Sequence, residues 1–203
     1  MNQEATFQAV LGAGFLTVLI VTLYHRLRSW ASREKLDRRQ EGILILATLR
    51  PVGLMLWLGV IAYAVDPGWM AWSSLPLPAG LRWTGVALCV LAVALLTWTL
   101  RGLGTNLTDT VVTRREHTLV THGPYRRVRH PFYDSMGLFI LAASLIAANW
   151  FLLLSGSVVF FLIVVRTRRE EENLLARFGE AYRAYMKKTG RFLPRIGMNR
   201  HGA

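Results

Sequence analysis

A polar segment from Glu116 to Tyr133 carries the residue types that could do chemistry in this chain. It reads EHTLVTHGPYRRVRHPFY and holds three of the five histidines of the sequence. Two prolines interrupt it, and each proline removes a backbone donor and favours extended geometry in the residue before it. One continuous helix is therefore excluded. Because burying an apolar core does not call for histidines, tyrosines and arginines at this density, we interpret the segment as an ordered polar loop shaped around a ligand.

A second polar segment, residues 166–172, reads RTRREEE and follows a long apolar stretch. Apolar side chains then recur at helical spacing, which predicts an amphipathic helix continuing from that stretch. These positions are Leu174, Leu175, Phe178, Tyr182, Tyr185 and Met186. Gly190 is expected to end this helix, and the closing sequence RFLP predicts a short extended end. We interpret Glu171 and Glu172 as part of a solvated helix face or as partners of Arg168 and Arg169.

The rest of the chain is apolar enough to span a membrane and so to position these two segments. Of its 203 residues, 53% are hydrophobic and 18% are charged. A helix that crosses a bilayer core about 30 Å thick needs about 20 apolar residues. Such runs occur at residues 5–24, 43–65 and 81–100, and residues 136–165 contain no formal charge. The sequence therefore predicts an all-α integral membrane protein.

The uncharged stretch from 136 to 165 decides the topology. As one helix it would be about 45 Å long, well over the thickness of the bilayer core. If it is instead a short helical hairpin that turns at Asn149, nearly all of the 24 Lys and Arg residues share one side of the membrane, as the positive-inside rule requires. We therefore predict five transmembrane segments in a prokaryotic inner membrane, with the N-terminus outside and the C-terminus cytoplasmic. The two polar segments then emerge together on the cytoplasmic side, as a loop and a C-terminal amphipathic helix.

Several other functions and sites are disfavoured. The 24 basic against 12 acidic residues lie between and after the apolar runs, which indicates membrane topology rather than nucleic-acid binding. Cys89 stands alone in an apolar run and predicts a packing or lipid-facing residue, and no metal site is expected, because the histidines lack acidic or cysteine ligands at suitable spacing. Arg50 has two interpretations, a side chain reaching the lipid interface or a cation that binds an anionic group in a polar cavity. The three loop arginines Arg126, Arg127 and Arg129 are expected to contact anionic headgroups.

Together these motifs resemble the isoprenylcysteine carboxyl methyltransferase family, which is related to membrane phospholipid methyltransferases. The resemblance runs from Gly104 to Pro194. It rests on H-T-L-V-T-x-G-P-Y-R-x-x-R-H-P-x-Y, a helical hairpin, R-T-x-x-E-E-E, F-G-x-x-Y and a closing R-F-L-P. Some membrane sterol reductases share the R-H-P-x-Y and E-E arrangement. The family often has a glycine two residues after R-H-P-x-Y, whereas this chain has Asp134 and Ser135 there. An acid at the mouth of a substrate tunnel could repel a carboxylate.

The resemblance implies S-adenosylmethionine as cofactor and a set of site residues. The positions that match cofactor contacts of the family are His117, Thr118, Leu119, Val120, Tyr125, His130, Pro131, Phe132, Tyr133 and Glu170. Arg166 matches an arginine assigned to the substrate's carboxylate, so its expected role is to orient the acceptor. Methyl transfer to an ionised carboxylate depends on orientation and a dry pocket, so no general base and no metal are assigned.

The apolar runs and the resemblance together divide the chain into two parts. Residues 1–100 are expected to form three transmembrane helices with a basic cytoplasmic connector at residues 25–42, and residues 101–203 to form the catalytic region. That region comprises a cofactor loop (101–135), the hairpin (136–165) and a C-terminal helix and tail (166–203).

We therefore predict an S-adenosylmethionine-dependent methyltransferase that acts on a lipophilic, membrane-embedded acceptor. The acceptor is expected to enter from the bilayer, as the carboxylate of a prenylated cysteine or a similar small lipid. Membrane lipids are the other expected partners. Two alternatives stay open: an NADPH-dependent membrane reductase of the sterol-reductase type, which needs a larger basic pocket for a diphosphate, and a non-catalytic membrane protein that uses the fold to bind a partner.

Overall fold

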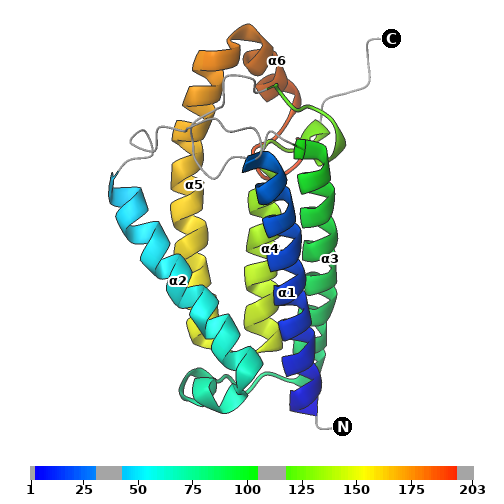
Figure 1. The fold of residues 1–203 in the computed structure, drawn as a ribbon, viewed down its shortest axis with the longest axis vertical. Coiled ribbons are helices and arrows are strands. Elements are labelled where there is room, and N and C mark those ends of the chain that lie inside the picture. The colour runs from blue at the N-terminus through cyan, green and yellow to red at the C-terminus, as the bar shows by residue number, and fades with distance from the viewer. Residues whose placement is uncertain (1–2, 31–42, 105–117, 196–203) are drawn as a thin grey trace.

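The computed structural model describes residues 3–30, 43–104 and 118–195, and these residues are helical apart from loops and two isolated bridges. The elements in chain order are α1 (Gln3–Trp30), α2 (Ile43–Val65), η2 (Pro67–Ser73), α3 (Ala79–Leu103), η4 (Gly123–Arg126), α4 (Pro131–Ile146), α5 (Trp150–Phe178) and α6 (Glu180–Lys188). In Figure 1 helices α1, α3, α4 and α5 run roughly along one axis, α2 is inclined to them, and α6 folds back from the end of α5.

Among these helices, four are long and apolar enough to cross a membrane. Their spans are Gln3–Ser29, Ala47–Val65, Ala79–Leu103 and Trp150–Phe178. The prediction of an all-helical, multi-pass membrane protein is therefore confirmed. The fifth segment, α4, has 16 residues and a length of about 24 Å, so its crossing of the bilayer stays a prediction.

The turn between α4 and α5 is fixed by Asn149. Its side-chain oxygen accepts a hydrogen bond from the Leu152 amide, which caps α5, while its amide nitrogen donates to the Met70 carbonyl and the Ser73 hydroxyl. A cap of this kind satisfies a donor that the first helical turn leaves open. Because Asn149 is 1% exposed, its amide links the turn firmly to η2. Trp72 of η2 is exposed, as is typical of aromatic side chains at a membrane interface.

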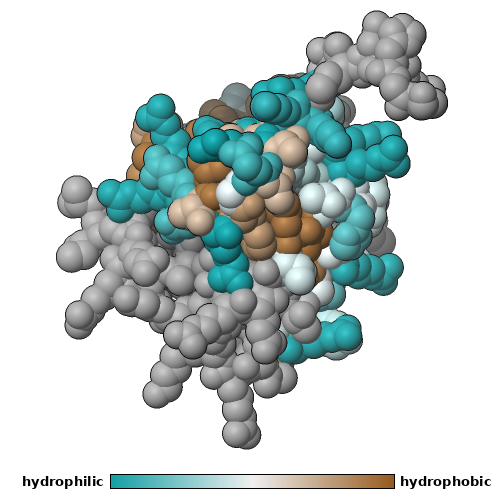
Figure 2. All heavy atoms as spheres, turned by 90° about the horizontal axis from the view of Figure 1, so that it is seen from above, coloured by the Kyte–Doolittle hydropathy of each residue, from teal (hydrophilic) through white to brown (hydrophobic). Residues whose placement is uncertain are grey.

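A second polar cluster joins four helices at the same end of the bundle. Arg82 of α3 forms an ion pair with Glu4 of α1 at 2.7 Å and donates from Nε to the Ile146 carbonyl of α4. Its guanidinium carbon lies 4.1 Å from the centre of the Phe7 ring, and Tyr63 of α2 donates to Glu4. The opposite end, seen in Figure 2, shows apolar surface surrounded by hydrophilic side chains.

The predicted C-terminal helix is divided, which corrects the expectation of one helix ending at Gly190. Helix α5 ends at Phe178, and Gly179 adopts a φ of 52° while its amide donates to the Leu175 carbonyl. Glycine takes a positive φ at little cost because it has no Cβ atom. The chain direction therefore changes at Gly179, and α6 is a separate helix that turns back toward the bundle (Figure 1).

Close packing of α3 against α4 leads to a testable prediction at Gly85. A Cβ atom added there would lie 2.8 Å from Leu145 Cβ and 2.9 Å from the Ile146 backbone nitrogen. Gly85→Ala is therefore expected to force the helices apart and to cost about 1–3 kcal/mol, measured as a lower midpoint of thermal unfolding in detergent. Gly80→Ala on the same helix is the control, because nothing lies within 4 Å of its Cβ. Equal midpoints for the two variants would contradict the packing.

Candidate functional site

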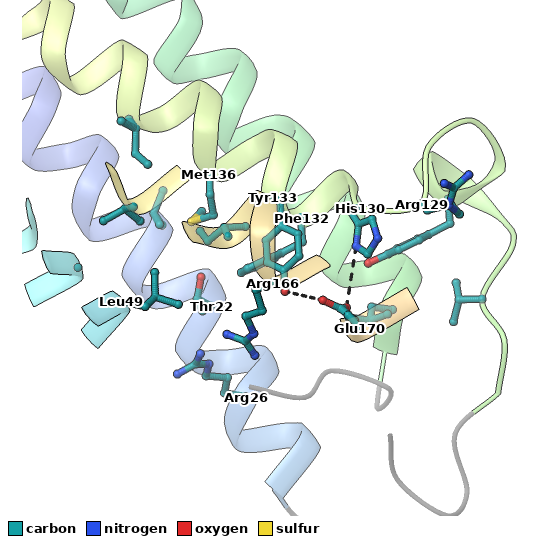
Figure 3. Close-up of a pocket in the computed structure, with 18 of the residues that line it drawn as sticks. Thr22, Arg26, Leu49, Arg129, His130, Phe132, Tyr133, Met136, Arg166 and Glu170 are labelled. Atoms are coloured by element: carbon teal, nitrogen blue, oxygen red, sulfur yellow. Dashed lines mark hydrogen bonds and ion pairs between the residues drawn. The ribbon is translucent and has the colours of Figure 1, made fainter. Parts of the chain in front are cut away.

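A cavity of about 910 Å³ lies among α1, α2, α4, α5 and α6. Small-molecule sites in proteins usually measure about 300–1,000 Å³. Half of this cavity volume still falls within the usual range for one small-molecule site, so the cavity is large enough for two ligands. Its walls combine aliphatic and aromatic side chains with arginines, tyrosines and one glutamate, as part of it is drawn in Figure 3.

Helix α5 contributes two charged side chains, Arg166 and Glu170, to the cavity. They stand four residues apart and therefore lie on one face of the helix. The Tyr133 hydroxyl of α4 donates to Glu170 Oε2 at 2.9 Å, and His130 Nδ1 lies 3.9 Å from Glu170 Oε1 (Figure 3). The predicted loop and the predicted glutamate helix thus meet at Glu170.

The loop before α4 forms another wall of the cavity. Gly123 has a φ of 59° and begins η4, which carries Tyr125 into the cavity wall. The Tyr185 hydroxyl of α6 donates to the Tyr125 carbonyl at 2.7 Å. Burial raises the pKa of Tyr125 and raises that of Tyr185 to about 12 despite the nearby Arg129. Both phenols are therefore neutral at physiological pH.

Glu171 is not part of a solvated face, and this interpretation was wrong. Its side chain is 5% exposed, and Oε1 accepts from Arg129 Nε at 2.8 Å and lies 3.3 Å from His130 Nε2. Arg191 donates to the other oxygen, Oε2. The expectation that Arg129 contacts lipid headgroups was also wrong, because its side chain is 8% exposed and paired with Glu171. This cluster, Glu171 with Arg129, His130 and Arg191, is called the Glu171 network below.

The C-terminal end of the described chain is bound to the same loop. The amides of Arg129 and His130 donate to the carbonyls of Gly190 and Arg191, and the Gly190 amide donates to the Arg127 carbonyl. The Phe192 ring lies 5.8 Å from the His130 ring. The extended end with the RFLP sequence therefore folds back over the loop that holds His130 and Tyr133.

The structure brings most of the predicted site residues together. Those that line the cavity are Thr118, Leu119, Val120, Tyr125, His130, Phe132, Tyr133, Arg166 and Glu170. Pro131 instead occupies the first turn of α4 and is buried, where its fixed φ suits a helix start. His117 lies outside the described residues. Asp134 is not among the lining residues, which removes the reason to expect repulsion of an acceptor carboxylate.

Other residues line the cavity that sequence reasoning did not assign to it: Arg26, Tyr182 and Tyr185. Tyr182 is 1% exposed, and its hydroxyl has no hydrogen-bond partner among the residues that the structure describes. Buried polar groups are nearly always satisfied, so an open hydroxyl in a cavity wall indicates a ligand partner. Tyr182 and Tyr185 were interpreted as apolar positions of one amphipathic helix. Their helical spacing did not predict the turn at Gly179. Arg50, for which two interpretations stood open, also lines the cavity.

In the described residues, no group of three or more His, Cys, Asp or Glu side chains could hold a metal ion. The histidine in the cavity wall, His130, is instead buried against the two carboxylates of Glu170 and Glu171. Among the described residues, the polar part of the site is thus a hydrogen-bonding and charged surface.

Comparison with known proteins relates this site to one family. The model of the isoprenylcysteine carboxyl methyltransferase (ICMT) family matches residues 85–176. The match to that family model is limited to these residues, which are called the family region below. The resemblance predicted from the sequence motifs is therefore confirmed. The family region starts in α3 and includes Tyr133, Arg166 and Glu170, but it ends before α6.

A solved structure supports the fold. The structure of the eukaryotic intramembrane Ras methyltransferase ICMT (isoprenylcysteine carboxyl methyltransferase) matches with a TM-score of 0.54 and 24% sequence identity. The match covers 72% of this chain and 52% of the solved one, so the chain spans about half the length of that protein. No curated protein sequence matches the chain.

Proposed function

We propose that this protein is an S-adenosylmethionine-dependent methyltransferase whose acceptor is a lipophilic molecule embedded in the membrane. The observation that carries the proposal is the convergence of Tyr133, Arg166 and Glu170, all within the family region, on one cavity with a largely apolar wall. A polar ligand at Glu170 and an apolar ligand against the helices would then share this space.

The residues of the cavity suit S-adenosylmethionine. The Glu170 carboxylate fits the ammonium or ribose hydroxyls of the cofactor, and charge-assisted hydrogen bonds of this kind are the stronger class. Tyr182 offers a buried hydroxyl without a partner among the described residues, and neutral Tyr125 offers an aromatic surface. When bound, the cofactor supplies a methyl group on a sulfonium, which bonds to the acceptor nucleophile as the carbon–sulfur bond breaks and sulfur keeps the electron pair.

The protein's own contribution is orientation and exclusion of water. Arg166 would hold the acceptor carboxylate beside Glu170, one helical turn away on the same face of α5. A carboxylate is already ionised at neutral pH, because its ordinary pKa is about 4, so no residue needs to remove a proton. The apolar wall keeps the reacting groups dry, and holding two reactants in position can lower a barrier by several kcal/mol.

We extend the proposal to the membrane arrangement. Helices α4 and α5 form the short hairpin of a five-segment topology, with the cavity facing the cytoplasm, the N-terminus outside and residues 101–203 as the catalytic region. Residues 1–100 then do more than anchor the protein, because α1 and α2 supply the other side of the cavity. A carboxylate of a prenylated cysteine or a similar small lipid would reach it from the bilayer.

One observation favours a second candidate function. The cavity holds Arg26, Arg50 and Arg166, and a basic pocket is what a diphosphate-bearing nicotinamide cofactor needs. An NADPH-dependent reductase of the sterol-reductase type is therefore the alternative that experiments must distinguish.

Transfer of a labelled methyl group tests the proposed reaction and the role of Arg166. Wild-type protein in liposomes is expected to move radiolabel from S-adenosylmethionine to N-acetyl-S-farnesylcysteine as an alkali-labile ester. Arg166→Gln should lower kcat/KM for this acceptor by about 100-fold, since it removes a charged pair made to the substrate. Its affinity for S-adenosylhomocysteine should change by less than about threefold.

Arg168→Gln is the matched control, because Arg168 is exposed on the same helix and is not among the cavity residues. Loss of cofactor affinity in Arg166→Gln with normal acceptor use would contradict the assigned roles.

A further inference from the structure

Three helices each contribute one arginine to the cavity wall, next to apolar lining residues. In α1 the lining residues are Phe15, Val18, Leu19, Thr22 and Arg26. In α2, which runs in the opposite direction (Figure 1), they are Ile61, Trp57, Leu56, Leu54, Gly53, Arg50 and Leu49. In α5 they are Val159, Ile163, Arg166, Glu170, Leu174 and Phe178.

The spacing shows that the arginines belong to the cavity-facing sides of their helices. Arg26 follows Thr22 by four residues, and Arg166 follows Ile163 by three, so each lies one turn above an apolar or small lining residue. In Figure 3 the guanidinium groups of Arg26 and Arg166 point into the same part of the cavity, with Thr22 beside them. Arg28 of α1 and Arg101 of α3 are exposed, as Arg26 and Arg50 are, but they are not lining residues.

An acceptor with one negative group does not balance the positive charges that line the cavity. Of the charged lining residues that the structure describes, Arg129 is paired with Glu171. The same cavity is lined by Arg26, Arg50 and Arg166 and by one carboxylate, that of Glu170. S-adenosylmethionine adds further positive charge, since its sulfonium and ammonium outnumber its carboxylate. One acceptor carboxylate at Arg166 would leave a surplus of positive charge at Arg26 and Arg50.

We propose that the acceptor is an amphiphile with two anionic groups: the carboxylate that receives the methyl group, held by Arg166, and a second carboxylate or phosphate held by Arg26 and Arg50. This rests on the proposed function and names the substrate class of the same site. Guanidinium groups bind carboxylates and phosphates through paired hydrogen bonds. The apolar chain of the amphiphile packs below the arginines, against Phe15, Trp57, Val159 and Ile163.

Paired ligands with one farnesyl chain test the second anionic group. N-acetyl-S-farnesylcysteine carries one carboxylate, and N-succinyl-S-farnesylcysteine carries two. Farnesyl diphosphate tests whether phosphate can occupy the same place. Affinities are measured by calorimetry in one nonionic detergent, with S-adenosylhomocysteine present, for wild type, Arg26→Gln/Arg50→Gln and the control Arg28→Gln/Arg101→Gln.

We expect wild type and the control to bind the two-carboxylate ligand at least about tenfold more tightly than the one-carboxylate ligand, with the preference falling at high salt. In Arg26→Gln/Arg50→Gln the two ligands should bind with about equal affinity. This variant should also lose affinity for farnesyl diphosphate. If wild type does not distinguish the ligands, or if the double variant keeps the preference, the second anionic group is ruled out and the arginines contact bilayer headgroups instead. Absence of S-adenosylhomocysteine binding in wild type is a separate result, and it overturns the proposed function itself.

Discussion

Glu170→Gln is expected to weaken the binding of S-adenosylhomocysteine by about 100-fold while leaving the protein folded. The amide keeps the size of the side chain but removes the negative charge that would meet the cofactor's ammonium. A hydrogen bond to a charged group contributes about 1.5–3 kcal/mol, and 2.7 kcal/mol corresponds to about 100-fold in affinity. The change also alters the acceptor of the Tyr133 hydroxyl, so Tyr133→Phe should weaken binding by a smaller factor in the same titration.

A control variant and a control measurement make this prediction specific. Glu172→Gln is the matched control, because Glu172 is exposed on the same helix and does not line the cavity. Thermal unfolding without ligand should give the same midpoint for Glu170→Gln, Glu172→Gln and wild type to within a few degrees. Unchanged affinity in both Glu170→Gln and Tyr133→Phe would remove these residues from the cofactor site.

Glu171→Ala should have the largest effect on stability. It removes a carboxylate that is 5% exposed and leaves Arg129, whose side chain is 8% exposed, without its partner. Breaking a buried ion pair in this way costs about 3–5 kcal/mol. In a chain of this size that corresponds to a fall of about 6–20 °C in the thermal midpoint.

The Glu171 network also predicts where the structure opens first. Arg191 and the backbone pairing at Gly190 hold the C-terminal end against the loop, so trypsin should cut after Arg191 and Arg195 faster in Glu171→Ala than in Glu172→Ala. Arg129→Ala should have a similar effect, and the double variant should be no less stable than the worse single variant because the two residues share one interaction. Equal midpoints and equal cleavage rates for Glu171→Ala and Glu172→Ala would contradict the network.

Glu170 and Glu171 show which features of the site could be predicted from the sequence and which could not. The motif indicated a helix with several adjacent carboxylates, and the family resemblance selected Glu170 among them. The sequence could not indicate the burial of Glu171, because its partners Arg129 and Arg191 lie 42 and 20 residues away and meet it only through the fold. Adjacent helical residues differ by about 100° in direction, so their environments differ even where their types agree.

The membrane helices were predictable for a simpler reason. The bilayer requires about 20 apolar residues per crossing, and that requirement appears directly in the sequence. The contribution of α1 to the site was not visible in this way, because Arg26 was counted with the charged connector. Its place in the cavity depends on how α1 is rotated against α5, which no local pattern specifies. Similarly, Tyr182 reaches the cavity only because Gly179 changes the direction of the chain.

Calorimetric titration of the detergent-purified protein with S-adenosylhomocysteine, and in parallel with NADPH, tests the central claim most directly. We predict that S-adenosylhomocysteine binds with a micromolar dissociation constant, that this binding is lost in Glu170→Gln, and that NADPH gives no heat of binding. Binding of NADPH alone would contradict the methyltransferase account and assign the arginines of the cavity to a diphosphate. Binding of neither ligand would contradict any cofactor site and indicate a membrane protein that uses the same fold to bind a partner.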